Sequence, residues 1–213
     1  MNLETIKYFK KGELTMKKIM IMAVILTAAL VLSSAACATA TTPLETVKNN
    51  ATRVLEILRD PALQGKAAEE AKKQRLRAVY YDMFDEVELS KRCLSRNWTK
   101  LNAEQQKEFV HLFHQLLENT YSERILAYKD EKVVFDRESR LSPTQAEVYT
   151  RIILSASEVP VFYRLILVND NWKVYDVVIE NVSLVQNYRS QFNEILTRNT
   201  PEKMLEILRN RLK

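Results

Sequence analysis

Hydrophobic residues recur every three to four positions between residues 43 and 121, which predicts a run of α-helices. Helix-start signals divide the run, because the capping residues Thr42, Asp85 and Asn102 are each followed three positions later by Glu or Gln. Four helices are therefore predicted, at 43–60, 62–81, 86–98 and from 103 to at least 121. The last has a wide apolar face. This face contains Phe109, Phe113, Leu117 and Tyr121.

Beyond residue 130 the pattern changes to short runs rich in Val, Ile, Tyr and Phe, which are typical of β-strands. Four strands are predicted, at 131–139, 145–155, 160–168 and 172–180. The segment 169–171 is expected to join the last two as a tight hairpin. Helices return after Ser183 and after Thr200, which both precede apolar residues at helical spacing. The predicted fold class is α+β, with helices packed on a four-stranded antiparallel sheet.

The register expected for the hairpin assigns its side chains to two faces. If Val168 faces Trp172, then Arg164 faces Asp176 as a cross-strand ion pair. The face of this pair also holds Phe162, Ile166, Val174 and Val178. The opposite face holds Val161, Tyr163, Leu165, Leu167, Tyr175, Val177 and Ile179. Because both faces are largely apolar, we expect the sheet to be covered on both sides or to line an apolar cavity between sheet and helices.

The N-terminus has the three parts of a secretory signal. Two lysines precede an apolar run at 19–32, and small residues that end in Ala-Thr-Ala follow it. We expect residues 1–40 to be a cleaved signal peptide and Thr41 to begin the mature chain. Residues 41–213 then form one domain, which agrees with their length.

Some alternatives at the N-terminus stay open. Translation starts at Met1 or at Met16, which begins the more conventional signal. The apolar run could instead be an uncleaved membrane anchor, and Cys37 could be acylated as in a lipoprotein. After cleavage before Thr41, Cys93 is the remaining cysteine, so an internal disulfide is not expected. Its position on an apolar helical face predicts a buried thiol.

Composition excludes several classes of function. Gly12 and Gly65 are the two glycines of the chain, whereas phosphate-binding loops and dinucleotide folds need several that are closely spaced. The formal net charge is +5, and an excess of three positive charges lies in residues 1–40. The remainder is close to neutral, which argues against nucleic acid as a partner.

Catalytic and metal sites find little support. His111 and His114 lie three residues apart, but two histidines without a further ligand make a weak metal site, and a solvated helix face explains them better. Asp85 is explained as a helix cap and Asp176 as the partner of Arg164. We expect no catalytic residue, metal or cofactor.

Two stretches carry a family resemblance. The first is FDEVELSKRCLSRNW at 84–98, which continues into the helix after Asn102. The second is WKVYDVVIENVSL at 172–184. In this order they resemble the MlaC family, the toluene-tolerance auxiliary proteins of lipid-transport ABC systems. Two positions depart from the family pattern, because Ser95 and Asn181 stand where the family often has glycine. Ser95 is expected to lie within a helix.

The resemblance implies a periplasmic, monomeric phospholipid-binding carrier that is not an enzyme. Such a protein shuttles lipid between an outer-membrane lipoprotein complex and an inner-membrane ABC transporter with an MCE-domain subunit. The role of the family is the maintenance of outer-membrane lipid asymmetry. A carrier needs an apolar interior without reactive groups, and the residue inventory of this chain agrees with that need.

The side chains expected to contact lipid come from the long fourth helix, the predicted hairpin and the helix after Ser183, with Phe84 between the second and third helices. They are Phe84, Phe113, Leu117, Tyr121, Tyr163, Leu165, Tyr175, Val177, Tyr188 and Phe192. Two other function classes stay open. One is a small periplasmic α+β enzyme that uses Asp176, and the other is an envelope scaffold protein with a filled core.

Overall fold

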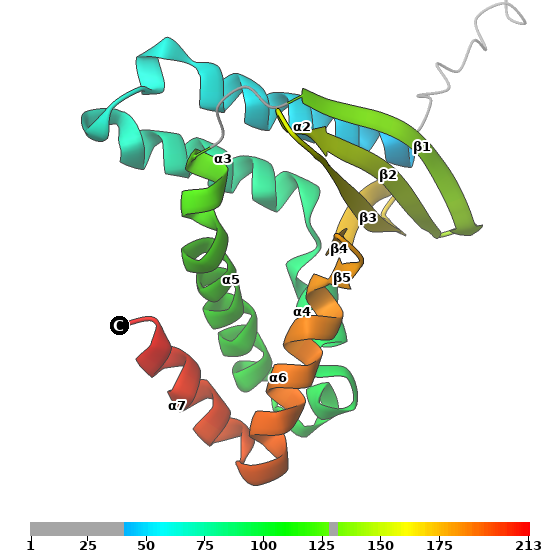
Figure 1. Ribbon diagram of the computed structural model, residues 1–213. Helices are drawn as coiled ribbons and strands as arrows, with labels where there is room; N and C mark the ends of the chain where they lie inside the picture. Colours follow the sequence, from blue (N-terminus) through cyan, green and yellow to red (C-terminus); the bar gives the residue numbers. More distant parts are fainter. Residues whose placement is uncertain (1–40, 128–131) are drawn as a thin grey trace, which may run out of the picture. The chain divides into compact units, whose positions relative to one another are not determined.

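The computed structural model describes residues 41–127 and 132–213, which belong to one compact unit (Figure 1). The predicted signal peptide and Cys37 lie outside the described residues. The helices are α2 (Pro43–Arg59), α3 (Glu69–Met83), α4 (Glu86–Leu94), α5 (Ala103–Leu126), α6 (Leu184–Arg198) and α7 (Pro201–Arg211). Short 3-10 helices cover Pro61–Leu63, Lys66–Ala68 and Ser95–Lys100.

Helix starts are where the sequence predicts them. Thr42 and Asn102 each form a complete capping box, and the carboxylate of Asp85 accepts the Glu88 N–H at 2.9 Å. These bonds satisfy backbone donors that the first helical turn leaves without a partner. The prediction of one continuous helix at 62–81 is wrong at its beginning. Gly65 has φ 83°, and two 3-10 turns precede α3 there.

The expectation that Ser95 lies within one continuous helix at 86–98 is also wrong, because the 3-10 helix begins there. Helix α4 ends at Leu94, and Ser95 has φ 51° and ψ −127°. Side chains with a Cβ rarely adopt this conformation, which glycine reaches without strain. Asn181, the other departure from the family pattern, has φ 66°, and asparagine tolerates this left-handed region. The two positions therefore differ in strain.

We expect Ser95→Gly to stabilise the domain by about 1 kcal/mol, because backbone strain of this kind amounts to roughly 1–3 kcal/mol. Ser190→Gly is the matched control. Ser190 lies inside α6, where glycine costs about 0.5–1 kcal/mol relative to alanine. Chemical denaturation of the two variants measures both effects. A Ser95→Gly variant that loses as much stability as Ser190→Gly would contradict the assignment of strain.

The strands form one antiparallel sheet in the order β1-β2-β3-β4-β5. Their bounds are β1 (Lys132–Ser142), β2 (Gln145–Ile153), β3 (Glu158–Val168), β4 (Asn171–Ile179) and β5 (Val182–Ser183). The predicted sheet of four strands is therefore incomplete. The two residues of β5 pair with the end of β4 and lead directly into α6. A two-residue strand is too short to show alternation, so the sequence pattern did not reveal it.

The hairpin between β3 and β4 differs from the expected register. Val168 pairs with Asn171 and not with Trp172, because the turn consists of Asn169 and Asp170, both with positive φ. Two such residues match the twist of the flanking strands. A register shift after Arg164 restores its pairing with Asp176 and pairs Leu165 with Val174. Val174 thus moves to the Leu165 face, contrary to the prediction, and Tyr175 becomes the extra residue of a bulge.

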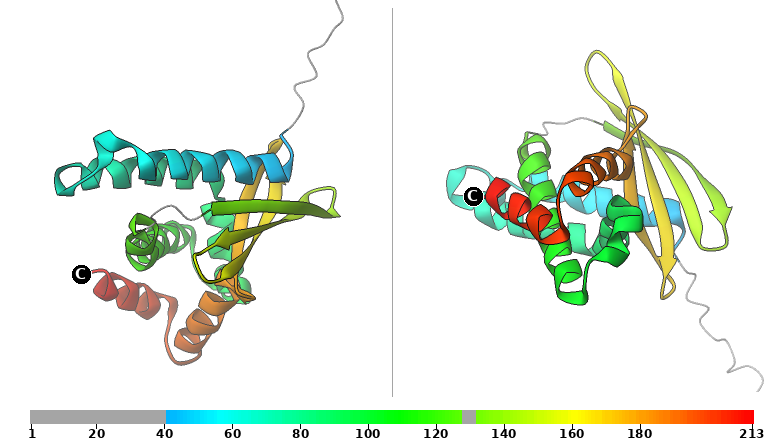
Figure 2. Two further views of the ribbon diagram at one scale, coloured as in Figure 1. Left: turned by 45° about the horizontal axis from the view of Figure 1, so that its top comes forward. Right: turned by 90° about the horizontal axis from the view of Figure 1, so that it is seen from below.

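Two hydrophobic clusters make up the core. The sheet cluster joins α2, the end of α3 and one face of the sheet, and the helix cluster joins α4, α5, α6 and α7 (Figures 1 and 2). Buried members of the sheet cluster are Val47, Met83, Ala146, Val148, Leu165, Trp172 and Val174. Those of the helix cluster include Leu89, Cys93, Phe109, Phe113, Leu117, Tyr188, Phe192 and Leu205.

Candidate functional site

The predicted lipid-contacting residues divide between the two clusters. Four are buried in the helix cluster, and Tyr121 packs against it. These four are Phe113, Leu117, Tyr188 and Phe192. Leu165 is buried in the sheet cluster, and Tyr163 and Val177 pack against it. Phe84 is partly buried and packs against both clusters, so it marks the boundary between them.

Phe84 is held at this boundary by backbone and ring contacts. It forms a parallel bridge with Val174, and the N–H of the next residue, Asp85, donates to the Val174 carbonyl at 2.9 Å. On its other side, the ring of Tyr80 stacks on Phe84 with 4.6 Å between centroids. A side chain fixed in this way positions the junction between sheet and helices.

The aromatic part of the helix cluster is closely packed. The ring of Phe113 lies 5.0 Å from that of Tyr188 and 5.3 Å from that of Phe192, both edge-to-face. Phe113 is 1% exposed. Edge-to-face rings at this spacing are a favourable aromatic arrangement. Phe113 and Phe192 are therefore core residues, whereas the side chains of Tyr121, Tyr163 and Val177 are only partly buried.

Tyr175 belongs to neither cluster. The bulge turns its side chain away from Leu165, and the guanidinium of Arg92 lies 3.8 Å from the centroid of its ring. Arg92 also binds Glu88 one turn earlier on α4. The ring of Tyr175 is thereby covered by an arginine from a helix, and it does not share the face of Tyr163 and Val177 that was predicted for it.

The interior tyrosines are not poised for proton transfer. Burial raises the pKa of Tyr163 to about 12. Burial is also the main cause that raises the pKa of Tyr121, and its hydrogen bond with Tyr188 adds to this. A general acid or base works best with a pKa near the pH of the medium. These hydroxyls therefore stay protonated at neutral pH and supply polar contacts only.

Asp176 is fully engaged inside the protein. Its side chain is 3% exposed and accepts the Ser183 hydroxyl at 2.7 Å, the Val185 N–H at 3.0 Å and Arg164 Nη1 at 3.1 Å. The predicted pairing with Arg164 is confirmed, although Arg164 binds Glu147 as well, at 2.9 Å. The contacts from β5 and α6 were not predicted. They make Asp176 the residue that ties the sheet to the start of α6.

Cys93 and the two histidines complete the candidates from the sequence. Cys93 is buried, as predicted, and burial raises the pKa of its thiol well above the usual range. His111 is exposed, but the expectation of a solvated His114 is wrong, because this side chain is 8% exposed. His114 belongs to α5, and its side chain contacts α3 and the start of α4. The helical pattern of α5 alone does not reveal these contacts. Within 41–127 and 132–213, no cluster of three or more His, Cys, Asp or Glu could hold a metal ion.

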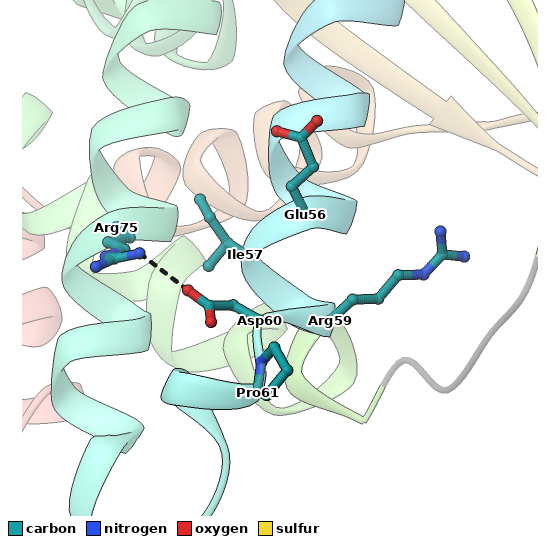
Figure 3. A pocket seen from close by; sticks show the side chains of 6 residues that line it. All are labelled: Glu56, Ile57, Arg59, Asp60, Pro61 and Arg75. Atoms are coloured by element: carbon teal, nitrogen blue, oxygen red, sulfur yellow. Dashed lines mark hydrogen bonds and ion pairs between the residues drawn. The ribbon is translucent and has the colours of Figure 1, made fainter.

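Two surface depressions lie away from the predicted site. One of about 510 Å³ lies at the end of α2, where Arg75 from the middle of α3 binds Asp60 at 3.2 Å (Figure 3). The other, of about 260 Å³, lies between the end of α4 and α6. Neither is lined by a predicted lipid-contacting residue, so the cavity stays a prediction. Among the helices of the described residues, none is both long and apolar enough to cross a membrane.

Comparison with known proteins connects this arrangement to a family. The sequence matches the family described as MlaC protein over residues 48–210. A curated relative, the toluene tolerance protein ttg2D of Pseudomonas putida, is 25% identical over 162 residues, which cover 75% of each chain.

A solved structure shares the fold. It is that of a phospholipid-binding protein from Ralstonia solanacearum in complex with a phospholipid, with a TM-score of 0.70 and 24% identity. The match covers 78% of this chain and 94% of that one. The architecture of helices on an antiparallel sheet is therefore common to both proteins. The resemblance of the two sequence stretches is confirmed by the family match, and the chain belongs to the MlaC family.

Proposed function

We propose that this protein binds a phospholipid and carries it through the periplasm. The observation that carries the proposal is the family match over residues 48–210. It is supported by the fold shared with a protein whose structure contains a phospholipid. The described residues add a chemical argument, because most of their buried side chains are apolar and the buried carboxylate of Asp176 is engaged in internal bonds. A carrier requires an apolar site without chemistry of its own.

The proposed position of the acyl chains is the boundary between the two clusters. Phe84 contacts both clusters there, while the partly buried side chains of Tyr163 and Val177 pack against the sheet cluster and that of Tyr121 against the helix cluster. An apolar cavity between sheet and helices at this boundary would remove acyl chains from water. The polar headgroup would stay outside.

The energetics of such a site favour exchange. Transfer of one CH₂ group from water stabilises by about 0.8 kcal/mol, so about thirty methylenes correspond to roughly 24 kcal/mol. This exceeds the practical limit of net non-covalent affinity, which is about 20 kcal/mol. The relevant transfer is from bilayer to protein, where both environments are apolar and most of this free energy cancels. Lipid can then enter and leave without a large change in free energy.

The proposed partners follow from the family. They are an outer-membrane lipoprotein complex and an inner-membrane ABC transporter with an MCE-domain subunit, and the proposed role is maintenance of outer-membrane lipid asymmetry. A signal peptide at residues 1–40 would deliver the chain to the periplasm. The carrier would act there as a monomer.

A transfer assay tests the proposal. Donor vesicles contain a fluorescent phospholipid with a quencher, and acceptor vesicles are unlabelled. The purified mature chain should increase the rate of dequenching in proportion to its concentration, because each molecule takes up and releases lipid. A rate equal to that of vesicles alone would count against a carrier and favour a scaffold with a filled core.

A further inference from the structure

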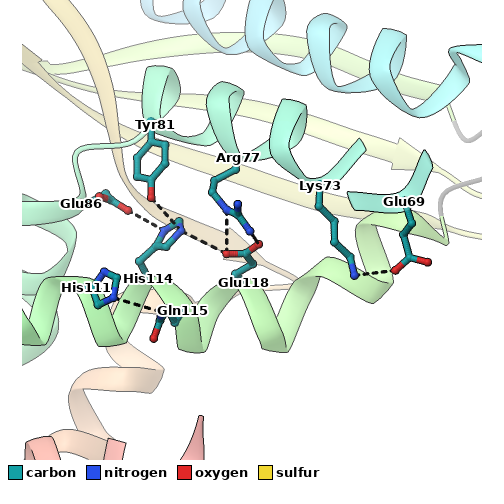
Figure 4. Close-up of polar contacts among 9 residues, drawn as sticks. All are labelled: Glu69, Lys73, Arg77, Tyr81, Glu86, His111, His114, Gln115 and Glu118. Carbon is teal, nitrogen blue, oxygen red and sulfur yellow. Dashed lines mark hydrogen bonds and ion pairs between the residues drawn. The ribbon is translucent and has the colours of Figure 1, made fainter. Parts of the chain in front are cut away.

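Helices α3 and α5 contact each other through polar side chains (Figure 4). Arg77 on α3 donates two hydrogen bonds to the carboxylate of Glu118 on α5, one of them from Nε at 3.2 Å and the other, from Nη2, short. The side chains of Arg77 and Glu118 are 34% and 25% exposed. This forked geometry fixes the orientation of both side chains, but the pair is partly exposed, and ion pairs in contact with solvent contribute only about 0–1 kcal/mol.

His114 continues the polar contact one turn along α5. Its Nε2 lies 3.3 Å from the Tyr81 hydroxyl on α3 and 3.5 Å from Glu118 Oε2, and its Nδ1 lies 2.8 Å from Glu86 Oε1 on α4. The rings of Tyr81 and His114 are stacked with 5.1 Å between their centroids. Figure 4 shows the Tyr81 hydroxyl pointing toward the imidazole. His114 therefore connects its own helix, α5, to α3 and α4.

These contacts are not those of an optimised permanent core. Glu86 Oε1 and His114 Nδ1 are buried and close, yet neither has a hydrogen bond of good geometry within the described residues. Buried polar groups of this kind stabilise less than well-packed apolar groups of the same volume. An interface closed by such contacts separates more readily than one closed by interlocking apolar side chains.

The polar contacts between α3 and α5 connect helices that belong to different hydrophobic clusters. The end of α3 contributes Met83 to the sheet cluster, whereas α5 contributes Phe113 and Leu117 to the helix cluster. The polar contacts therefore bridge the two clusters, beside the Phe84 boundary where acyl chains are proposed to lie. Separation of α3 from α5 would expose that boundary.

We infer that Arg77, Tyr81, His114 and Glu118 form a polar latch that holds α3 against α5 and opens to admit and release the lipid. This inference rests on the proposed carrier function. Closure keeps acyl chains from water, and opening exchanges contacts between side chains for contacts with water. The latch thus sets the rate of exchange, and the apolar boundary sets the affinity.

The test compares two arginines that each bind a carboxylate of α5. Arg77→Met breaks the latch and keeps an apolar stem. Arg209→Met is the control, because Arg209 on α7 binds Glu108 on the surface of α5, and both helices contribute to the helix cluster, so this pair does not bridge the clusters. In the vesicle transfer assay, Arg77→Met should exchange lipid about fivefold faster than the unaltered protein, as expected for loss of a partly buried ion pair. Arg209→Met should leave the rate unchanged.

A second variant guards against a folding defect. Tyr81→Phe removes the hydroxyl near His114 and keeps the stacked ring, and about a twofold faster exchange is expected. If the unaltered protein transfers lipid and both latch variants transfer it at the same rate, the latch is wrong and the carrier function stands. If the unaltered protein transfers no lipid, the carrier function fails and the latch fails with it.

Discussion

Replacement of Asp176 by alanine is expected to destabilise the domain by about 3–5 kcal/mol, the usual effect of removing one partner from a buried charged network. Three donors lose their acceptor together, namely the Ser183 hydroxyl, the Val185 N–H and Arg164 Nη1. The Val185 N–H belongs to the first turn of α6 and would be left buried without a partner. For a domain of this size, each kcal/mol of lost stability lowers Tm by about 2–4 °C, so the Tm of the variant should fall by roughly 10 °C.

Glu194→Ala provides the control for this prediction. Glu194 is an exposed carboxylate on α6, the helix whose first turn Asp176 binds. It should change the free energy of unfolding by less than about 0.5 kcal/mol. Urea denaturation measures both variants. An Asp176→Ala protein with wild-type stability would show that the network contributes nothing, and it would reopen an enzymatic role for Asp176.

The network also determines the effect of charge reversal. If Arg164 and Asp176 formed an isolated pair, exchange of the two charges would preserve function better than either single reversal. An arginine at 176 cannot accept hydrogen bonds from Ser183 and Val185, so the paired exchange should remain strongly destabilising.

The second large effect is functional. Val177→Trp is expected to abolish lipid binding while it changes the free energy of unfolding by less than about 1 kcal/mol, because added bulk is tolerated where space is open. Val177 pairs with Tyr163, is only partly buried and packs at the margin of the sheet cluster. A tryptophan there would occupy the proposed path of an acyl chain. Phospholipid extracted from the purified variant, quantified by its phosphorus content, measures the loss.

Ile179→Trp is the matched control on the same strand. Ile179 is 42% exposed near the end of β4, where a larger side chain projects into water. This variant should keep its lipid. If Val177→Trp instead unfolds the protein, Val177 lies in solid core, and the proposed position of the acyl chains is wrong.

Local signals made much of the fold predictable. The caps at Thr42, Asp85 and Asn102 act within four residues, so the starts of α2, α4 and α5 could be predicted from the sequence alone. The alternation of the four longer strands was equally local. The bulge at Tyr175 was not predictable, because it depends on how the Asn169–Asp170 turn and the Arg164–Asp176 pairing are satisfied together. One extra residue was enough to move Val174 from one face to the other.

The candidate site was predictable only as a set of apolar residues. The sequence identified which side chains are apolar, but their division into two clusters depends on contacts between helices that are distant along the chain. His114 illustrates the same limit. On α5 alone it lies beside the face of Phe109 and Phe113, and its burial comes from Tyr81 and Glu86 on neighbouring elements. The burial of His114 therefore depends on tertiary contacts.

Native mass spectrometry of the protein purified from the periplasm tests the central claim most directly. The proposed function predicts a main species whose mass exceeds that of the mature chain by one phospholipid. Collisional activation should release this mass, and the Val177→Trp protein should lack it. A spectrum that contains the mature chain alone, recorded under conditions that preserve other non-covalent lipid complexes, would contradict the claim that this protein is a phospholipid carrier.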